Sequence, residues 1–419
     1  MIQITDKHQC CGCEACAQIC PKYCIRFEAD DEGFLYPQVD KQECIGCGLC
    51  EKTCPVLHPH PSIVPLNVYA AKNKCEEELL ASSSGGLFIA IAKKVIKDGG
   101  VIFGAKFDAD WNVIHSYADT MEGVKAFMGS KYVQSRIGNT FSEAKDFLRA
   151  GRKVLFTGTS CQIAALKNFL QKDYDNLLTI DVICHGVPSP KVWQRYLDEI
   201  KRNALQGVKN SVPSPLIPNV SERDALSKGN EMDIKDISFR DKRISWEKFS
   251  LTFTLAKPSS EGKQNTVSLS HIFFEDAYMR LFLNDYTLRP CCYSCPTKSG
   301  RSHSDLTIAD FWGIELNHPE LADNEGVGLL IVNTLKGMDI IDKLLLEIHG
   351  VTMSEATVWN PSYYVSKPRP SKREKFFREF HKNNASLEQL ANGFLRRTTC
   401  CKIVSFIKTK IHSVKKHLL

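Results

Sequence analysis

The sequence lacks any apolar run of about 18–20 residues, the length that a membrane-spanning helix needs. Its first 20 residues are polar and rich in cysteine, so they also lack the apolar core of a secretory signal. The missing export signal and the many cysteines together predict a cytoplasmic protein, because thiols stay reduced in that compartment. Hydrophobic residues make up 43% of the 419 residues, which is the usual share for a globular protein of two or three domains.

Outside the C-terminal residues 396–419, the positive and negative charges of the chain nearly balance. The whole chain carries a formal charge of +6, but this tail holds seven basic residues and no acidic one, so the remainder is close to neutral. No basic surface for nucleic acid is therefore expected in the body of the protein. Ile403, Ile407 and Ile411 recur in the tail at helical spacing and predict a basic amphipathic helix. This helix either packs on its own domain or makes peripheral contact with a membrane surface or an acidic partner.

Cysteine is abundant, and it is concentrated in a repeated motif. The run C-x2-C-x2-C-x3-C-P occurs twice within residues 10–55. In bacterial ferredoxins the first three thiolates of such a run hold one 4Fe-4S cluster and the fourth ligates the other cluster. The spacing predicts two clusters, one held by Cys10, Cys13, Cys16 and Cys54 and the other by Cys44, Cys47, Cys50 and Cys20.

Two other uses of these cysteines are weaker. Structural zinc sites use four ligands, usually as two CxxC pairs, and do not repeat the four-cysteine run. A disulfide scaffold is typical of small secreted domains. The motif therefore favours an iron–sulfur protein.

The rest of the chain alternates predicted strands, turns and helices, which is typical of an α/β fold. Strands are expected at 68–71, 101–107, 153–156 and 178–183, with helices starting near residues 87 and 164. Residues 206–230 are rich in Ser, Asn and Pro and predict an insertion or a mobile loop. We expect a ferredoxin-like dicluster domain at 1–57, a linker at 58–66, a larger mixed α/β flavin and iron–sulfur domain at 67–370, and a basic tail at 371–419.

Several short motifs follow in a fixed order along residues 82–313. They are SSSGG (82–86), GSKYVQS (129–135), GTSCQIAAL (158–166), CHGVPSP (184–190), FRDK (239–242) and the stretch from RPCCYSC to SDLTIADFWG (289–313). Together with the N-terminal cysteines, this order resembles the coenzyme F420 hydrogenase/dehydrogenase beta subunit family, in the form that carries a dicluster ferredoxin domain. The resemblance covers about residues 1–370.

The resemblance implies a flavin site. It would be lined by the 82–86 and 129–135 segments, with donors from Ser83, Ser84, Gly85 and Gly86 and a cation from Lys131. Taken alone, the serine-rich loop before a helix is a phosphate-binding hypothesis, but it also fits an ordinary helix cap. Lys131 alone would equally fit a solvated surface lysine.

Four further cysteines fall inside these motifs and suggest a third 4Fe-4S cluster. Cys292 and Cys295 form a CxxC pair, which favours Cys292 over its neighbour Cys291. The set is Cys161, Cys184, Cys292 and Cys295. The alternative is that Cys161 and Cys184 are small buried hydrophobic residues at strand ends. Five other cysteines have no partner pattern and are interpreted as bystanders: Cys11, Cys24, Cys75, Cys400 and Cys401.

The family implies an oxidoreductase in which FAD exchanges hydride with a carrier, in the founding members coenzyme F420, and iron–sulfur clusters pass electrons to a protein partner. The catalytic residues cannot be named from the motifs. His185 and Asp310 fit either a proton relay or structural hydrogen bonds. The alternative function is a non-catalytic dicluster electron-transfer subunit without flavin, serving for example a cell-envelope polysaccharide pathway.

Overall fold

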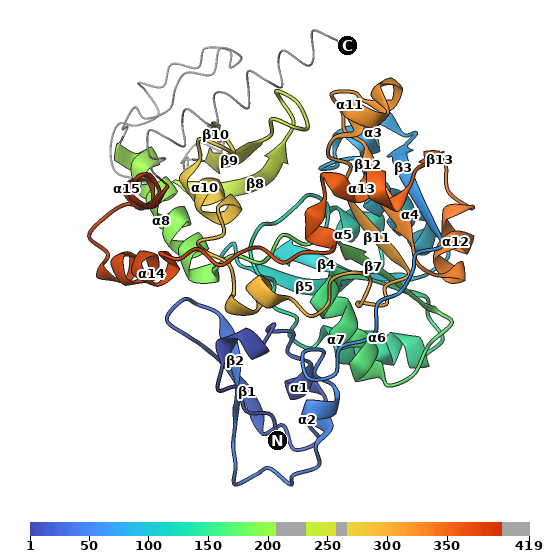
Figure 1. The fold of residues 1–419 in the computed structure, drawn as a ribbon, viewed down its shortest axis with the longest axis horizontal. Helices are drawn as coiled ribbons and strands as arrows, with labels where there is room; N and C mark the ends of the chain where they lie inside the picture. The colour runs from blue at the N-terminus through green and yellow to red at the C-terminus, as the bar shows by residue number, and fades with distance from the viewer. Residues whose placement is uncertain (207–231, 257–265, 396–419) are drawn as a thin grey trace, which may run out of the picture.

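The computed structural model describes residues 1–206, 232–256 and 266–395, and its centre is a mixed sheet of eight strands (Figure 1). Across the sheet the strand order is β13-β3-β12-β11-β7-β6-β4-β5. In chain order the strands are β3 (Asn67–Asn73), β4 (Val101–Phe107), β5 (Val113–Ala118), β6 (Val154–Thr159), β7 (Leu177–Val182), β11 (Leu306–Asp310), β12 (Gly328–Val332) and β13 (Leu346–Gly350).

The four central strands β4, β6, β7 and β11 are parallel, and the outer strands pair antiparallel to them or to one another. In a parallel sheet the carboxyl ends of the strands meet at one edge, where ligands usually bind. Cys161 lies two residues after β6, and Cys184 lies two residues after β7. The topology therefore brings two of the four cysteines proposed for a third cluster to the same edge.

Helices cover both faces of this sheet because successive strand residues point in opposite directions. In β4, Ile102 packs with α4 (Leu87–Lys97) on one face, while Phe103 packs with α6 (Thr140–Arg149) and α7 (Ser160–Leu170) on the other. The other helices around the sheet are α3 (Glu76–Leu80), α5 (Met121–Lys125), α11 (Ile314–Asn317), η3 (Pro319–Leu321), α12 (Leu335–Ile341), α13 (Met353–Val358) and η4 (Pro361–Tyr363).

The N-terminal cysteine-rich region packs below α6 and α7 (Figure 1). A two-stranded antiparallel hairpin separates the two cysteine runs, and each run leads into a single helical turn. Gly12, Gly46 and Gly48 take the positive φ that these tight loops need. The elements are η1 (Lys7–Gln9), α1 (Ala15–Gln18), β1 (Ile25–Ala29), β2 (Leu35–Val39) and α2 (Leu49–Lys52).

A second, three-stranded antiparallel sheet packs against four helices through a core of aromatic side chains. Trp193, Phe253 and Tyr278 are fully buried at its centre. The sequence motifs did not predict this unit. Its elements are α8 (Pro190–Gln206), β8 (Asp233–Asp241), β9 (Ser250–Ala256), β10 (Thr266–Ile272), α10 (Ala277–Leu283), η2 (Pro290–Ser294), α14 (Arg373–Lys382) and α15 (Leu387–Phe394).

The predicted fold class is confirmed: a ferredoxin-like dicluster region precedes a larger mixed α/β region. The expected strands and helices between residues 68 and 183 all form, within one to four residues of their predicted ends. The predicted loop at 206–230 and the amphipathic helix at 396–419 lie outside the described residues, except at residue 206, where α8 ends. Among the helices that the structure describes, none is long and apolar enough to cross a membrane.

Candidate functional site

The four cysteines proposed for the first cluster lie together. Cys10, Cys13, Cys16 and Cys54 are each 7–8% exposed. Burial raises the pKa of Cys16, and its neighbours Cys10 and Cys54 raise it further. Cys54 therefore reaches across to the loop of the first run, as the ferredoxin pattern predicts.

The four cysteines proposed for the second cluster surround a small pocket at the far end of the same region. Cys20, Cys44, Cys47 and Cys50 line it together with Cys24. The Sγ atoms of Cys20 and Cys24 are 3.4 Å apart. Cys47 is exposed to solvent, so this end of the region is the one that a partner protein can approach.

The spacing of the thiols fits clusters better than single metal ions. A zinc ion with four sulfurs at about 2.3 Å would hold them about 3.8 Å apart. Within the described residues, the one trio of ligand atoms that lie within 4.8 Å of each other is His318, Glu320 and His349, and it contains no cysteine. No cysteine set in the described part of the chain is therefore arranged around a single metal ion.

The remaining four predicted ligands converge from three separate loops. Cys161 begins α7, Cys184 follows β7, and Cys292 and Cys295 lie in and directly after η2. Burial raises the pKa of Cys184, followed by the charges of Cys292, Cys161 and Cys295 as neighbours. The structure therefore brings all four thiols together at the carboxyl edge of the parallel strands.

Cys291 and Cys292 differ in their surroundings. The Sγ atom of Cys292 accepts a 3.5 Å hydrogen bond from the Val187 amide. The Cys291 thiol also lines the cavity but is the more buried of the two, and it packs in the core with α6 and α7. A hydrogen bond from Cys291 lowers the pKa of Cys292 to about 7, which favours the thiolate form that ligates iron.

A cavity of about 650 Å³ opens beside these four cysteines. Its wall includes every residue that the family resemblance assigned to a flavin: Ser83, Ser84, Gly85, Gly86 and Lys131. The Oγ atom of Ser83 accepts a 2.9 Å hydrogen bond from the Ser130 amide, so the two predicted segments are joined directly. An apolar cavity of this size with a few polar groups is a typical cofactor site.

Lys131 supplies a positive charge at the cavity wall. Its Nζ donates to the carbonyl oxygens of Met128 and Gly129 at 2.9 and 3.1 Å. It also lies 5.8 Å from the centre of the Phe107 ring. Burial lowers the pKa of Lys131 to about 8, so an anion in the cavity would stabilise its charged form.

Gly85 and Gly86 shape the serine-rich loop. A side chain at Gly85 would lie 2.4 Å from the Ala71 carbonyl oxygen and from the Gly328 amide, so the loop packs directly on β3 and β12. Gly86 has φ +72° and begins α4, a helix of 11 residues. Backbone amides at such a helix start are suited to an anionic group.

The two proposed proton-relay residues both have charged partners. His185 Nε2 lies 2.7 Å from Asp285, and Asp310 accepts a 2.8 Å hydrogen bond from Arg240. Arg240 is buried between the rings of Phe249 and Trp312. These contacts support the structural interpretation of both residues and hold one wall of the cavity in place.

Besides Cys24 at the second cysteine set, sequence reasoning missed three residues that line or adjoin the cavity. Cys11, interpreted as a bystander, lies beside both Cys13 and Cys161; hydrogen bonding to Cys13 is the main reason that its pKa is raised. His115 lines the cavity, and burial lowers its pKa to about 4, so it is neutral. Lys298 donates to the Cys184 carbonyl oxygen at 3.0 Å. None of the three carries a spacing signal.

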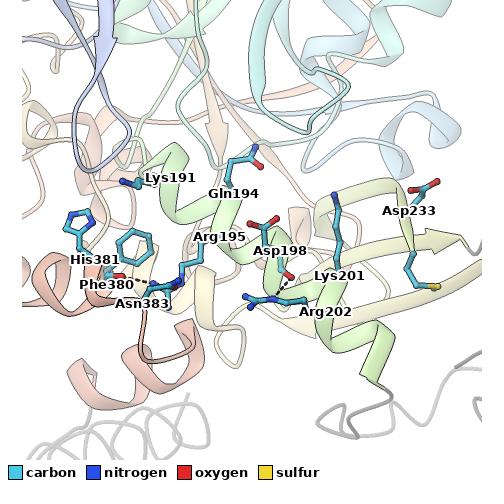
Figure 2. A pocket seen from close by; sticks show the side chains of 11 residues that line it. Lys191, Gln194, Arg195, Asp198, Lys201, Arg202, Asp233, Phe380, His381 and Asn383 are labelled. Carbon is cyan, nitrogen blue, oxygen red and sulfur yellow. Dashed lines mark hydrogen bonds between the residues drawn. The ribbon is translucent and has the colours of Figure 1, made fainter. Parts of the chain in front are cut away.

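A second hollow, of about 780 Å³, lies between α8 and the end of α14 (Figure 2). Arg195 donates to the Phe380 carbonyl oxygen at 2.7 Å across it, so this charge serves to hold the two helices together. The hollow is lined by neither a cysteine nor a predicted site residue. The predicted site residues therefore line the cysteine-containing cavity and not this hollow.

Comparison with known proteins agrees with the motifs. Residues 9–57 match the family model of the 4Fe-4S dicluster domain, and residues 151–213 match the model of the C terminus of the coenzyme F420 hydrogenase/dehydrogenase beta subunit. No curated protein sequence matches the chain. Among solved structures, the F420-reducing NiFe hydrogenase complex from Methanosarcina barkeri contains a chain with 15% identity and a TM-score of 0.42, covering 77% of this chain and 93% of that one.

The two matches lie in the predicted order, one in the dicluster region and one across β6, α7 and β7. The chain is therefore an iron–sulfur electron-transfer protein related to the coenzyme F420 hydrogenase/dehydrogenase beta subunits, with a 4Fe-4S dicluster domain at its N-terminus.

Proposed function

We propose that the protein is an iron–sulfur flavoprotein oxidoreductase that passes electrons between a hydride carrier and a protein partner. The carrier would be coenzyme F420 or a similar hydride donor. The observation that carries the proposal is that one cavity is lined both by Lys131 and the serine-rich loop and by the four cysteines Cys161, Cys184, Cys292 and Cys295. A flavin bound there would interconvert two-electron hydride transfer and one-electron transfer to clusters.

The ligand sets form a continuous series, which is the arrangement that one-electron transfer needs. The Cys11 thiol lies between Cys13 of the first set and Cys161 of the third. Cys16 of the first set in turn has Cys50 of the second set as a neighbour. The proposed domains are therefore 1–57 for the clusters of the first two sets and 67–370 for the flavin and the third, joined by 58–66 and followed by 371–419.

The partner protein would approach the second set. Cys47 is exposed there, and the nearby side chains of Tyr23 and Ile45 are 83% and 62% exposed. Exposed apolar residues beside a redox centre suit a transient protein contact. The cysteines of the first set are buried, and those of the third set are only partly exposed.

Iron content tests the third ligand set. We expect Cys292→Ala to contain about four fewer irons per chain than the wild type, because one 4Fe-4S cluster loses a ligand. Cys75→Ala is the matched control, since Cys75 is exposed at the start of α3 and should leave the iron content unchanged. Cys291→Ala should also keep its iron. Full iron in Cys292→Ala, or the loss of four irons in Cys291→Ala instead, would contradict the assignment.

Flavin affinity tests the role of Lys131. We expect Lys131→Met to weaken FAD binding about 10- to 100-fold, as for the loss of a hydrogen bond to a charged group. Affinity should also fall in the wild type as the pH rises above 8, because the free lysine then loses its proton, whereas Lys131→Arg should keep its affinity. Lys125→Met is the control, because Lys125 is exposed on α5 and paired with Glu122. Titration of the flavin-free protein with FAD measures each value, and equal affinities would refute the role.

The hydride carrier is tested separately. Reduced F420 added to the anaerobically loaded protein should bleach the flavin absorbance within the turnover time. Bleaching by a nicotinamide but not by F420 would remove F420 from the proposal and keep the oxidoreductase. A protein that binds no FAD would instead be the non-catalytic dicluster electron-transfer subunit.

A further inference from the structure

Arg289 is a fully buried cation that touches a predicted cluster ligand. Its side chain is 0% exposed. Nη2 lies 3.5 Å from the Sγ atom of Cys10 and donates to the Leu35 carbonyl oxygen at 2.8 Å, while Nε donates to the Cys10 carbonyl oxygen at 2.7 Å. Nη1 donates to Oε1 of Gln134 at 3.0 Å. The guanidinium group, which belongs to the larger domain, therefore binds the first cysteine loop.

The positive charge of Arg289 is not neutralised by a carboxylate. No Asp or Glu side chain in the described part of the protein forms an ion pair with it, whereas the buried Arg240 and Arg373 pair with Asp310 and Glu32. The charge of Arg289 does act on Glu14, but the carboxylate of Glu14 accepts hydrogen bonds from the Ile137 and Gly138 amides instead. A buried charge without a counter-charge is costly, so the thiolate of Cys10 is its natural counter-charge, with the thiols of Cys291 and Cys11 as further neighbours.

The surroundings of Arg289 strengthen this interaction. The guanidinium carbon lies 4.4 Å from the centre of the Tyr36 ring and 5.3 Å from that of Phe34, and these rings exclude water. A side chain at Gly12 would lie 2.6 Å from Nη1, so the absence of one lets the arginine reach the cysteine loop. Such a site has a low effective dielectric constant, where a fixed charge acts strongly.

The main chain of Arg289 is hydrogen-bonded to the loop that carries Cys292 of the third ligand set. Its carbonyl oxygen accepts a 2.9 Å hydrogen bond from the Cys292 amide, and its amide donates to the Val187 carbonyl oxygen at 2.9 Å. Its main chain is thus fixed to one ligand set while its side chain contacts another. The residue stands between the two sets that the proposed electron path connects.

We propose that Arg289 raises the reduction potential of the cluster held by Cys10, Cys13, Cys16 and Cys54. Reduction adds one electron to that centre and makes it more negative, so a fixed positive charge and an N–H···S hydrogen bond favour the reduced form. The arginine keeps its proton throughout, so its positive charge would be the same beside the oxidised and the reduced cluster. Arg289 is a positioning residue that acts through the Cys10 thiolate, the predicted ligand that its side chain contacts. This inference rests on the proposed function.

The test is a potentiometric titration followed by electron paramagnetic resonance of the anaerobically loaded full-length protein. A Cys13→Ser variant identifies the signal of the first cluster. In Arg289→Gln we expect the equilibrium constant for reducing that cluster to fall about tenfold, which is about 59 mV for one electron. The cluster at Cys20, Cys44, Cys47 and Cys50 should change less than twofold.

Arg373→Gln is the matched control. Arg373 is also buried and also joins the dicluster region to the larger domain, through a 2.7 Å contact with Glu32, but it touches no cysteine. Removing it should change the equilibrium constant for reducing the first cluster less than twofold relative to the wild type. An equal shift in both variants, or no shift in Arg289→Gln, would overturn the proposal.

Arg289→Lys covers the case in which the glutamine variant does not fold. Lysine keeps the charge but has a single donor group, which cannot replace the separate contacts to Cys10 and Leu35. In this variant we expect the equilibrium constant for reducing the first cluster to fall by only about threefold. An unchanged potential would refute the role of the hydrogen bond. Absence of iron from the wild type would refute the proposed function itself, whereas an unmoved potential in loaded protein refutes only the role of Arg289.

Discussion

The first cysteine loop is bound to the larger domain by buried polar contacts, and the relative placement of the redox sites depends on them. Glu14 accepts hydrogen bonds from the Ile137 and Gly138 amides, and Gln18 accepts one from the Phe141 amide at the start of α6. Arg289 donates a hydrogen bond to the Cys10 carbonyl oxygen of the same loop. Hydrogen bonds to charged groups contribute about 1.5–3 kcal/mol each, and leaving these groups unpaired would cost at least as much. The two ligand sets are therefore held at a fixed separation.

This docking explains why residues that look unremarkable in the sequence matter in the fold. Cys11 follows the first ligand directly, and its thiol lies where the dicluster region meets α7. The carboxyl ends of the parallel strands bring Cys161 and Cys184 to that meeting point. The same thiols also line the cavity of about 650 Å³. The proposed flavin site would thus lie directly beside the thiols of the proposed electron path.

Much of this arrangement could be predicted from the sequence, because local spacing carries it. The cysteine runs, the hairpin between them and the elements from β3 to β7 follow from motifs and periodicity within short windows. The second sheet was missed because no motif marks its strands, and the pairing of β8 with β9 is irregular near Ile234 and Ser238. The roles of Arg289 and Cys11 could not be predicted, since each depends on contacts between segments far apart in the chain. The domain limits and the ligand sets remain predictions.

The most direct test of the account is to quantify iron, sulfide and flavin on one anaerobically purified sample. Three ligand sets and one cavity predict about twelve irons, about twelve sulfides and about one FAD per chain. About eight irons without flavin would contradict the account. The protein would then be a dicluster electron carrier, and Cys161, Cys184, Cys292 and Cys295 would be structural cysteines.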